Sequence, residues 1–235
     1  MAKHKLARFA QLATFDHVIQ PKLEEVLNKD YKLKGNWNKE FFKNGLPIVL
    51  ELGCGKGEYT TGLAERYPDK NFLGVDIKGA RIWKGATIAL QNNLKNVGFL
   101  RTRIEQISSF FAPDEVSEIW ITFPDPQEKR IRATKRLTSS QFLTMYGKFL
   151  QPGGVIHLKT DNALLYNYTC ALCLRNKLDV LFNTNDLYNS DLNEEVLLSI
   201  KSHYEALFVA KGFSIKYIRF KIEEHKTFSE PHEKD

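Results

Sequence analysis

From about residue 48 onward, short apolar runs alternate with longer segments in which apolar residues recur at helical spacing. Seven runs have the length and the β-branched and aromatic content of buried strands, at residues 47–52, 72–76, 97–102, 118–122, 155–159, 179–183 and 215–221. Helical segments are expected between them, at residues 59–67, 80–94, 139–150, 163–175 and 194–210. The alternation predicts an α/β fold of the Rossmann-like kind, a mostly parallel seven-stranded sheet with helices on both faces.

Turn-forming residues set the expected limits of these elements. Ser139 and Ser140 can cap a helix that runs to Leu150, because a serine hydroxyl can accept a hydrogen bond from a free amide of the first turn. The Pro-Gly-Gly run at residues 152–154 is then expected to terminate that helix.

The first part of the chain differs from the rest. Residues 1–46 show no clear period, so we predict a basic N-terminal extension there, followed by the α/β domain at 47–235. A length of 235 residues with 43% hydrophobic content suits one large domain with a substantial core.

The chain is basic, with a formal net charge of +6 and a pI near 9.1. Such a charge is compatible with a polyanionic partner. The positions of the cations along the chain are more informative than the net charge. Five cations crowd directly after a Pro-Asp-Pro turn: Lys129, Arg130, Arg132, Lys135 and Arg136. The lysines between residues 29 and 43 fit a solvated surface equally well.

Cysteine content and hydropathy indicate the cellular compartment in which the protein is expected. The three cysteines do not make a disulfide framework, and the C-x-x-C at Cys170 and Cys173 has no second pair with which to hold a metal. No apolar run reaches the roughly 18 residues of a membrane span, and the basic amino terminus has no apolar signal core. We therefore expect a cytoplasmic protein with no membrane partner and no metal.

A glycine-rich turn follows the first predicted strand. The run from Glu51 to Glu58 reads E-x-G-x-G-x-G, and its glycines let the backbone turn sharply and approach a ligand. Asp76 ends the second strand, where an acid meets ribose hydroxyls in such folds. Two carboxylates at neighbouring strand tips suit a cationic, ribose-bearing ligand, so we predict S-adenosylmethionine. A nicotinamide cofactor, which prefers G-x-G-x-x-G, is the less favoured alternative.

A second motif follows the fourth predicted strand, in Phe123-Pro124-Asp125-Pro126. The two prolines fix their own φ angles and restrict the residues before them, so Asp125 stands on a stiff turn. Another acid, Asp161, follows the fifth strand. Both acids are expected at the carboxyl edge of the sheet, where ligands bind in open α/β folds.

Taken together, these motifs resemble those of the bacterial tRNA (guanine-N7-)-methyltransferase family, which modifies the variable-loop guanine at position 46. The resemblance spans most of the chain. It rests on the segment at residues 5–10, on Phe-Pro-Asp-Pro at 123–126, on Thr160-Asp161, and on Ser-His-Tyr-Glu at 202–205, where the family usually has T-x-[FY]-E. It implies a class I S-adenosylmethionine-dependent methyltransferase fold and tRNA as the substrate.

The resemblance also implies roles for individual residues. The cofactor would be bound by Glu51, Gly53, Gly55, Asp76, Arg103, Ile104 and Asp125, and Asp125 takes the catalytic position. The RNA or the target guanine would be contacted by Lys129, Asp161, Ser202, His203, Tyr204 and Glu205, with Arg130, Arg132 and Lys135 as candidates for phosphate contact. Arg103-Ile104 falls where the family often has aspartate or asparagine, so contact there is expected through the backbone.

Two other functions remain open at this point. One is a different S-adenosylmethionine-dependent RNA base methyltransferase, since the glycine motif does not choose the target. The other is a non-catalytic RNA-binding protein on the same scaffold. Loss of Glu51, Asp76 or the glycines would favour this last reading, and all of them are present.

Overall fold

The computed structural model describes residues 2–192, 195–222 and 227–231. These residues form one eight-stranded sheet with the strand order β1-β4-β3-β2-β5-β6-β8-β7. The strands are β1 (Val18–Ile19), β2 (Ile48–Leu52), β3 (Asn71–Asp76), β4 (Val97–Arg101), β5 (Val116–Thr122), β6 (Leu150–Thr160), β7 (Val180–Thr184) and β8 (Lys216–Lys221). Strands β1 to β6 pair in parallel, whereas β8 runs antiparallel between β6 and β7. The predicted fold class is confirmed, with one strand more than expected.

The additional strand comes from the segment predicted as an extension. Val18 and Ile19 pair with Phe99 and Leu100 of β4, a contact too short to leave a pattern in the sequence. Further along, the Trp37 side chain is fully buried and its indole N–H donates to the carbonyl oxygen of Phe110. Side chains of the first 46 residues thus pack on the same core as the rest, and the proposed division at residue 46 stays a prediction.

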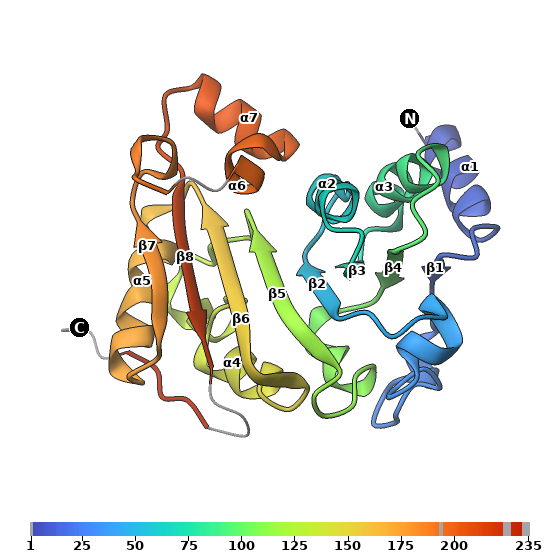
Figure 1. Ribbon diagram of the computed structural model, residues 1–235, viewed down its shortest axis with the longest axis horizontal. Helices are drawn as coiled ribbons and strands as arrows, with labels where there is room; N and C mark the ends of the chain where they lie inside the picture. The colour runs from blue at the N-terminus through green and yellow to red at the C-terminus, as the bar shows by residue number, and fades with distance from the viewer. Residues whose placement is uncertain (1, 193–194, 223–226, 232–235) are drawn as a thin grey trace.

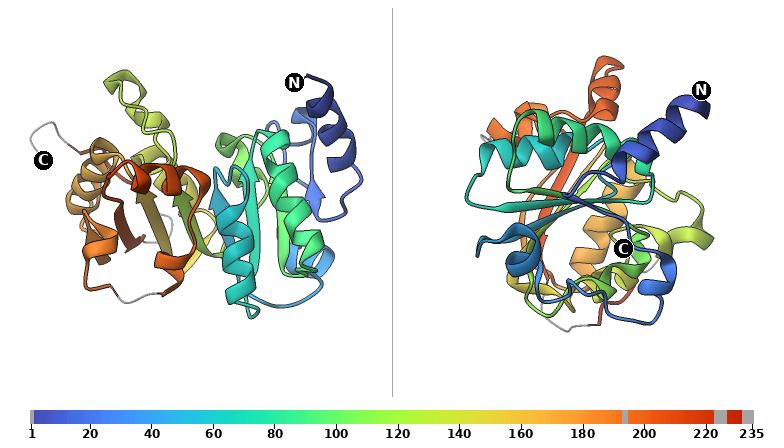
Figure 2. Two further views of the ribbon diagram at one scale, coloured as in Figure 1. Left: turned by 90° about the horizontal axis from the view of Figure 1, so that it is seen from above. Right: turned by 90° about the vertical axis from the view of Figure 1, so that its right-hand side faces the viewer.

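Helices cover both faces of the sheet (Figures 1 and 2). The α-helices are α1 (Ala2–Leu12), α2 (Glu58–Arg66), α3 (Gly79–Gln91), α4 (Ser140–Tyr146), α5 (Ala163–Arg175), α6 (Glu195–Ser199) and α7 (His203–Ala210). Short turns of other helix types are η1 (Leu23–Glu25), η2 (Trp37–Phe42), η3 (Ile104–Ser109), η4 (Arg130–Lys135) and η5 (Leu187–Asn189).

The strands are buried on both faces, and their side chains alternate between two hydrophobic clusters. In β2, Leu50 packs in the cluster with residues of α4 and α5, whereas Val49 packs in the cluster with residues of α2 and α3. Trp120 of β5 lies in the second cluster as well. This alternation sends Glu51, which follows Leu50, to the α2 side of the sheet.

Two predicted helices are corrected. The helix expected at 139–150 ends at Tyr146, and residues 152–154 lie inside β6, because Leu150 already pairs with Val116 of β5. Ser139 does cap this helix, accepting from the Phe142 amide. The helix expected at 194–210 is two helices, α6 and α7, separated where Ser202 caps the second. Its predicted first residue, Glu194, lies outside the described residues.

Strands β2, β5 and β6 point toward the edge of the sheet at which α6 and α7 lie (Figure 1). The carboxyl ends of parallel strands are where ligands bind in open α/β sheets. The topology therefore places the glycine turn after β2, the Pro-Asp-Pro turn after β5 and Asp161 after β6 at one edge.

Candidate functional site

The glycine turn joins β2 to α2 and depends on left-handed backbone conformations. Gly53 has a φ of +80° and Gly57 a φ of +73°, which favour glycine. At Gly57 a Cβ atom would also lie 2.8 Å from the ring of Phe99 and 3.1 Å from the Cα of Gly85. The third glycine of the motif thus lets the start of α2 pack closely against α3 and β4.

Glu51 is the buried acid beneath this turn, with an exposed fraction of 4%. One carboxylate oxygen accepts from the amide (2.8 Å) and the hydroxyl of Thr60, and the other accepts from the Thr122 hydroxyl at 2.7 Å. Burial raises the pKa of Glu51 to about 7, although the bonds from Thr60 and Thr122 oppose the shift. Glu51 therefore ties β2, α2 and β5 together and titrates near neutral pH.

Asp76, at the end of β3, holds the turn from the other side. Its carboxylate accepts from the Gly55 amide at 3.0 Å and from the Lys78 amide at 2.7 Å. Each carboxylate oxygen has a further lone pair, so these bonds orient Asp76 and leave it able to accept hydrogen bonds from a ligand.

A cavity of about 360 Å³ lies beside Asp76. It is lined by Gly53, Asp76, Ile77, Thr102, Arg103, Ile104, Glu105, Lys135, Leu137 and Phe142. Four residues predicted to bind the cofactor are thus brought together, and the volume suits a ligand of nucleoside size. Glu105 is a residue that the sequence analysis missed. Its signal was an acid just after the Arg103-Ile104 pair.

A second, smaller cavity of about 70 Å³ also borders the glycine turn. It is lined by Glu51, Gly53, Cys54, Gly55, Lys56, Glu58, Arg81, Thr122, Phe123, Ser202, His203 and Tyr204. Gly53 lines both cavities, so both border the turn. The arrangement brings the predicted substrate segment at 202–204 against the predicted cofactor turn, and the Arg81 guanidinium donates to the Tyr204 hydroxyl at 3.4 Å.

The Pro-Asp-Pro turn after β5 is held in an unusual backbone conformation. Phe123 and Gln127 on either side have φ angles of +48° and +46°, which non-glycine residues rarely adopt. Asp125 is exposed, and its carboxylate accepts from the Gln127 amide at 3.0 Å. Asp125 does not itself line either cavity, but its near neighbour Phe123 lines the smaller one.

Arg136 supports this turn from below. It is only 6% exposed, donates to the carbonyl oxygens of Pro126 (3.2 Å) and Gln127 (3.3 Å), and stacks on the Tyr168 ring at 4.3 Å. The sequence groups Arg136 with the cations that follow the turn. The structure gives it a supporting role instead, because its guanidinium is taken up inside the protein.

The remaining cations of this cluster are exposed: Lys129, Arg130, Arg132 and Lys135. They belong to or precede η4, the yellow-green segment that projects from the body in both views of Figure 2. Lys135 also lines the 360 Å³ cavity, so the cationic segment begins at the solvent edge and reaches the predicted cofactor site.

Asp161 follows β6 and is partly buried, and desolvation raises its pKa. The next residue, Asn162, caps α5 by accepting from the Leu165 amide and donates to the Glu128 carboxylate at 3.2 Å. This bond joins the two acid-bearing loops, after β5 and after β6.

The segment at 202–205 divides into an exposed and a buried part. Ser202 caps α7, and His203 and Tyr204 are exposed beside the smaller cavity. Glu205 differs from the prediction of substrate contact, because it is fully buried and forms an ion pair with the equally buried Lys159. The Tyr188 hydroxyl donates to the same carboxylate at 2.7 Å. The Glu205 carboxylate therefore faces the interior and anchors α7.

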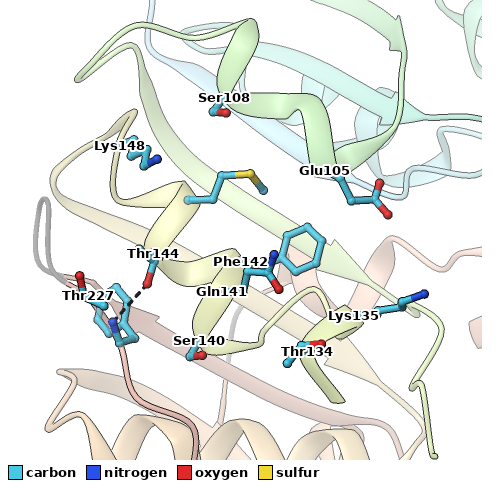
Figure 3. A pocket seen from close by; sticks show the side chains of 12 residues that line it. Glu105, Ser108, Thr134, Lys135, Ser140, Gln141, Phe142, Thr144, Lys148 and Thr227 are labelled. Atoms are coloured by element: carbon cyan, nitrogen blue, oxygen red, sulfur yellow. Dashed lines mark hydrogen bonds between the residues drawn. The ribbon is translucent and has the colours of Figure 1, made fainter. Parts of the chain in front are cut away.

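A larger hollow of about 670 Å³ adjoins the cofactor cavity (Figure 3), sharing Glu105, Lys135 and Phe142 with it. Lys135 and Lys148 stand at opposite ends of this hollow, with Phe142 between them. The Phe228 amide closes one side by donating to the Thr144 hydroxyl at 3.1 Å. The hollow extends the cofactor cavity along α4 with cations at its rim.

The described residues contain neither a cluster of metal ligands nor a membrane-spanning helix. No group of three or more His, Cys, Asp or Glu side chains there is arranged to hold a metal ion. No helix in that part of the chain is long and apolar enough to cross a membrane.

The chain is similar to known methyltransferases. A family model described as "Putative methyltransferase" matches residues 46–218. A tRNA (guanine-N(7)-)-methyltransferase of Bacteroides thetaiotaomicron is 53% identical over 231 residues, which cover 98% of this chain and 90% of the relative. One of Christiangramia forsetii is 49% identical, covering 94% of this chain and 99% of the relative. The solved 16S rRNA methyltransferase KamB superposes with a TM-score of 0.60 at 13% identity, covering 81% of this chain and 94% of that chain, which supports the fold alone.

Proposed function

The chain belongs to the bacterial tRNA (guanine-N(7)-)-methyltransferase family, and we propose that it transfers the methyl group of S-adenosylmethionine to N7 of the variable-loop guanine at position 46 of tRNA. The observation that carries this proposal is that Gly53 of the glycine turn lines two cavities. The larger is lined by four of the predicted cofactor residues, Gly53, Asp76, Arg103 and Ile104. The smaller is lined by Glu51, Gly53 and Gly55 of that set together with the predicted substrate segment at 202–204. A methyl donor in the larger cavity and an acceptor base at the substrate segment would therefore border the same glycine turn.

The residues of the 360 Å³ cavity fit the cofactor. Gly53 allows close approach of the backbone, Gly55 borders the neighbouring smaller cavity, and Asp76 would accept from the ribose hydroxyls. Arg103 and Ile104 would contact the adenine through the backbone, and the Glu105 carboxylate can accept from its exocyclic amine. When bound, S-adenosylmethionine supplies a methyl group on a positively charged sulfur.

Methylation of the acceptor base requires little proton transfer by this protein. Guanine N7 carries a lone pair and no proton, so no general base is needed and catalysis comes from positioning and electrostatics. We assign Asp125 to accept from guanine N1–H and the exocyclic amine, with Asp161 beside it. Positive charge builds on the ring as the N7–methyl bond forms, and a nearby carboxylate stabilises it. Ser202, His203 and Tyr204 would contact the substrate, and Glu205 would position them.

The exposed cations after the turn would bind the RNA backbone. Lys129, Arg130, Arg132 and Lys135 carry four positive charges beside the catalytic acid. Contacts of this kind weaken steeply with salt, because binding releases counterions from the RNA. They would offset the cost of exposing a guanine that tertiary pairing holds in the tRNA core, a few kcal/mol by analogy with base flipping.

The decisive experiment is a methyl-transfer assay with labelled S-adenosylmethionine and unmodified tRNA, with and without guanine at position 46. Incorporation that vanishes when this guanine is replaced supports the proposal. Persistent incorporation would move the target elsewhere and favour another RNA base methyltransferase. Cofactor binding without incorporation into any tRNA would favour a non-catalytic RNA-binding protein. We expect activity without an obligatory protein partner, in the cytoplasm, from a monomer or a homodimer.

Glu51 makes cofactor binding depend on pH. In the free protein burial raises its pKa to about 7, so the side chain is about half protonated at neutral pH. A cationic ligand beside it favours the ionised form and lowers this pKa, so binding releases a proton. The affinity for S-adenosylmethionine should therefore strengthen by up to about tenfold as the pH rises from about 6 to 8.

This prediction is checked by calorimetry across that pH range in buffers with different enthalpies of ionisation. The Glu51→Gln variant keeps an acceptor for Thr60 and loses the titration, so its remaining pH dependence is that of the ligand alone. Identical pH profiles for the two proteins would contradict a titrating Glu51.

A further inference from the structure

The cationic segment after the Pro-Asp-Pro turn carries a highly exposed isoleucine. Ile131 has an exposed fraction of 88%, the highest among the large hydrophobic side chains that the structure describes. It stands between Arg130 and Arg132 in η4. A single exposed apolar side chain is ordinary on a protein surface, so its meaning depends on what holds it there.

The segment that carries Ile131 is fixed at its base. The buried Arg136 binds the carbonyl oxygens of Pro126 and Gln127, and its own amide donates to the Ala133 carbonyl at 3.0 Å. The Arg132 amide donates to the Lys129 carbonyl at 2.8 Å, which closes a turn that contains Arg130 and Ile131. The projection seen in Figure 2 is thus held in place at its root, while its tip extends into solvent.

The charges around the tip identify the partner. Arg130 and Arg132 lie on either side of Ile131, and Lys129 and Lys135 lie at the two ends of η4. An apolar side chain between cations matches a nucleic acid, in which phosphates flank a stack of bases. Proteins that unstack a duplex insert isoleucine, leucine or phenylalanine between base steps while cations hold the backbone.

We propose that Ile131 is a wedge that enters the stack beside the target guanine and takes its place as that base leaves the tRNA core. The inference rests on the proposed function and adds to it a residue that opens the substrate. Ile131 stands six positions after Asp125 in the chain, on a segment that Arg136 joins to the Asp125 turn. The wedge and the acid that receives the base are therefore carried by one rigid unit.

A wedge matters only where there is a stack to open, and this gives a selective test. The kcat/KM for methylation is measured for the wild type, Ile131→Ser and Ile131→Leu on two tRNAs. One tRNA is native, and in the other the bases that pair with the target guanine are replaced so that it is already loose. We expect Ile131→Ser to lower kcat/KM about tenfold on the native tRNA and less than about twofold on the loosened one. Ile131→Leu should stay within about twofold on both.

Two further variants serve as controls. Leu174→Ser removes a leucine that is 75% exposed on α5, and should leave kcat/KM unchanged on both tRNAs. Arg132→Ala should weaken binding of both tRNAs alike and reduce its salt dependence, as expected for a phosphate contact.

A fluorescence measurement tests unstacking without turnover. With 2-aminopurine at the target position, wild-type protein should raise the fluorescence as the base leaves the stack, and Ile131→Ser should raise it less at saturating protein. Equal losses on both tRNAs, or no loss on either, would overturn the wedge. If wild-type protein methylates neither tRNA, the proposed function itself fails, and that outcome is distinct from failure of the wedge.

Discussion

Replacing Asp125 by alanine is expected to lower kcat for tRNA methylation by about a thousandfold while the Kd for S-adenosylmethionine changes by less than about twofold. The physical reason is the position of this carboxylate. It stands exposed on a turn fixed by two prolines, by left-handed conformations at Phe123 and Gln127, and by the buried Arg136. Such a turn would present a preorganised charge to a base that becomes positive during the reaction, and Asp125 does not line the cofactor cavity.

The variant Asp125→Asn separates charge from geometry. The Asp125 side chain accepts from the Gln127 amide, and asparagine can keep this bond and hence the turn. Single-turnover rates with saturating cofactor and tRNA, together with calorimetric cofactor titrations, measure both quantities. A loss in Asp125→Asn as large as that in Asp125→Ala would place the effect in the charge. Near-normal turnover in Asp125→Ala would contradict the catalytic assignment.

The fold could be predicted from the sequence because its strands carry their own signal. The run 48–52 is apolar except for Glu51, ends in a glycine turn and is buried on both faces, so the pattern reflects local burial directly. The strand at Val18–Ile19 could not be predicted, because it exists only through pairing with Phe99 and Leu100. For the same reason the helix after Ser139 was predicted too long, since the pairing of Leu150 with Val116 outweighs helical propensity there.

The site was predictable where a motif fixes the backbone, and less so where a charge finds a distant partner. Gly53 and Asp76 meet at one cavity because both end neighbouring strands. Arg136 and Glu205 look like surface charges in the sequence, since such residues are rarely buried unless paired. The partner of Glu205 is Lys159 on β6, and no local pattern links two positions so far apart in the chain.

The second prediction with a large expected effect concerns the buried pair of Lys159 and Glu205. Lys159 and Glu205 are both fully buried, and the Lys159 ammonium also donates to the Leu197 carbonyl at 2.7 Å. Removing one charge leaves the other without compensation in the interior, which typically costs about 3–5 kcal/mol. We therefore expect Glu205→Gln to lower the free energy of unfolding by about this amount, as measured by urea denaturation at pH 7.

Lys159→Met combined with Glu205→Gln is the matched control, because it leaves no unpaired charge. It should recover a large part of the loss, and the double-mutant cycle then isolates the coupling between the two side chains. Equal losses in the single and double variants would show that packing, rather than charge, dominates at this site.

The pH dependence of the Glu205→Gln variant follows from the pKa of Lys159. Burial lowers this pKa, and the Glu205 carboxylate is the main opposing influence. Without Glu205 the pKa of Lys159 falls further below its unfolded value, so the folded state binds fewer protons than the unfolded state and its stability rises with pH. The deficit of Glu205→Gln should therefore shrink between pH 7 and 9. Since Glu205 anchors the start of α7, the folded variant should also show a raised KM for tRNA with an unchanged Kd for S-adenosylmethionine. A deficit that is constant with pH would mean that Lys159 has the same protonation state in both folded proteins, and that loss of Glu205 does not shift its pKa across this range.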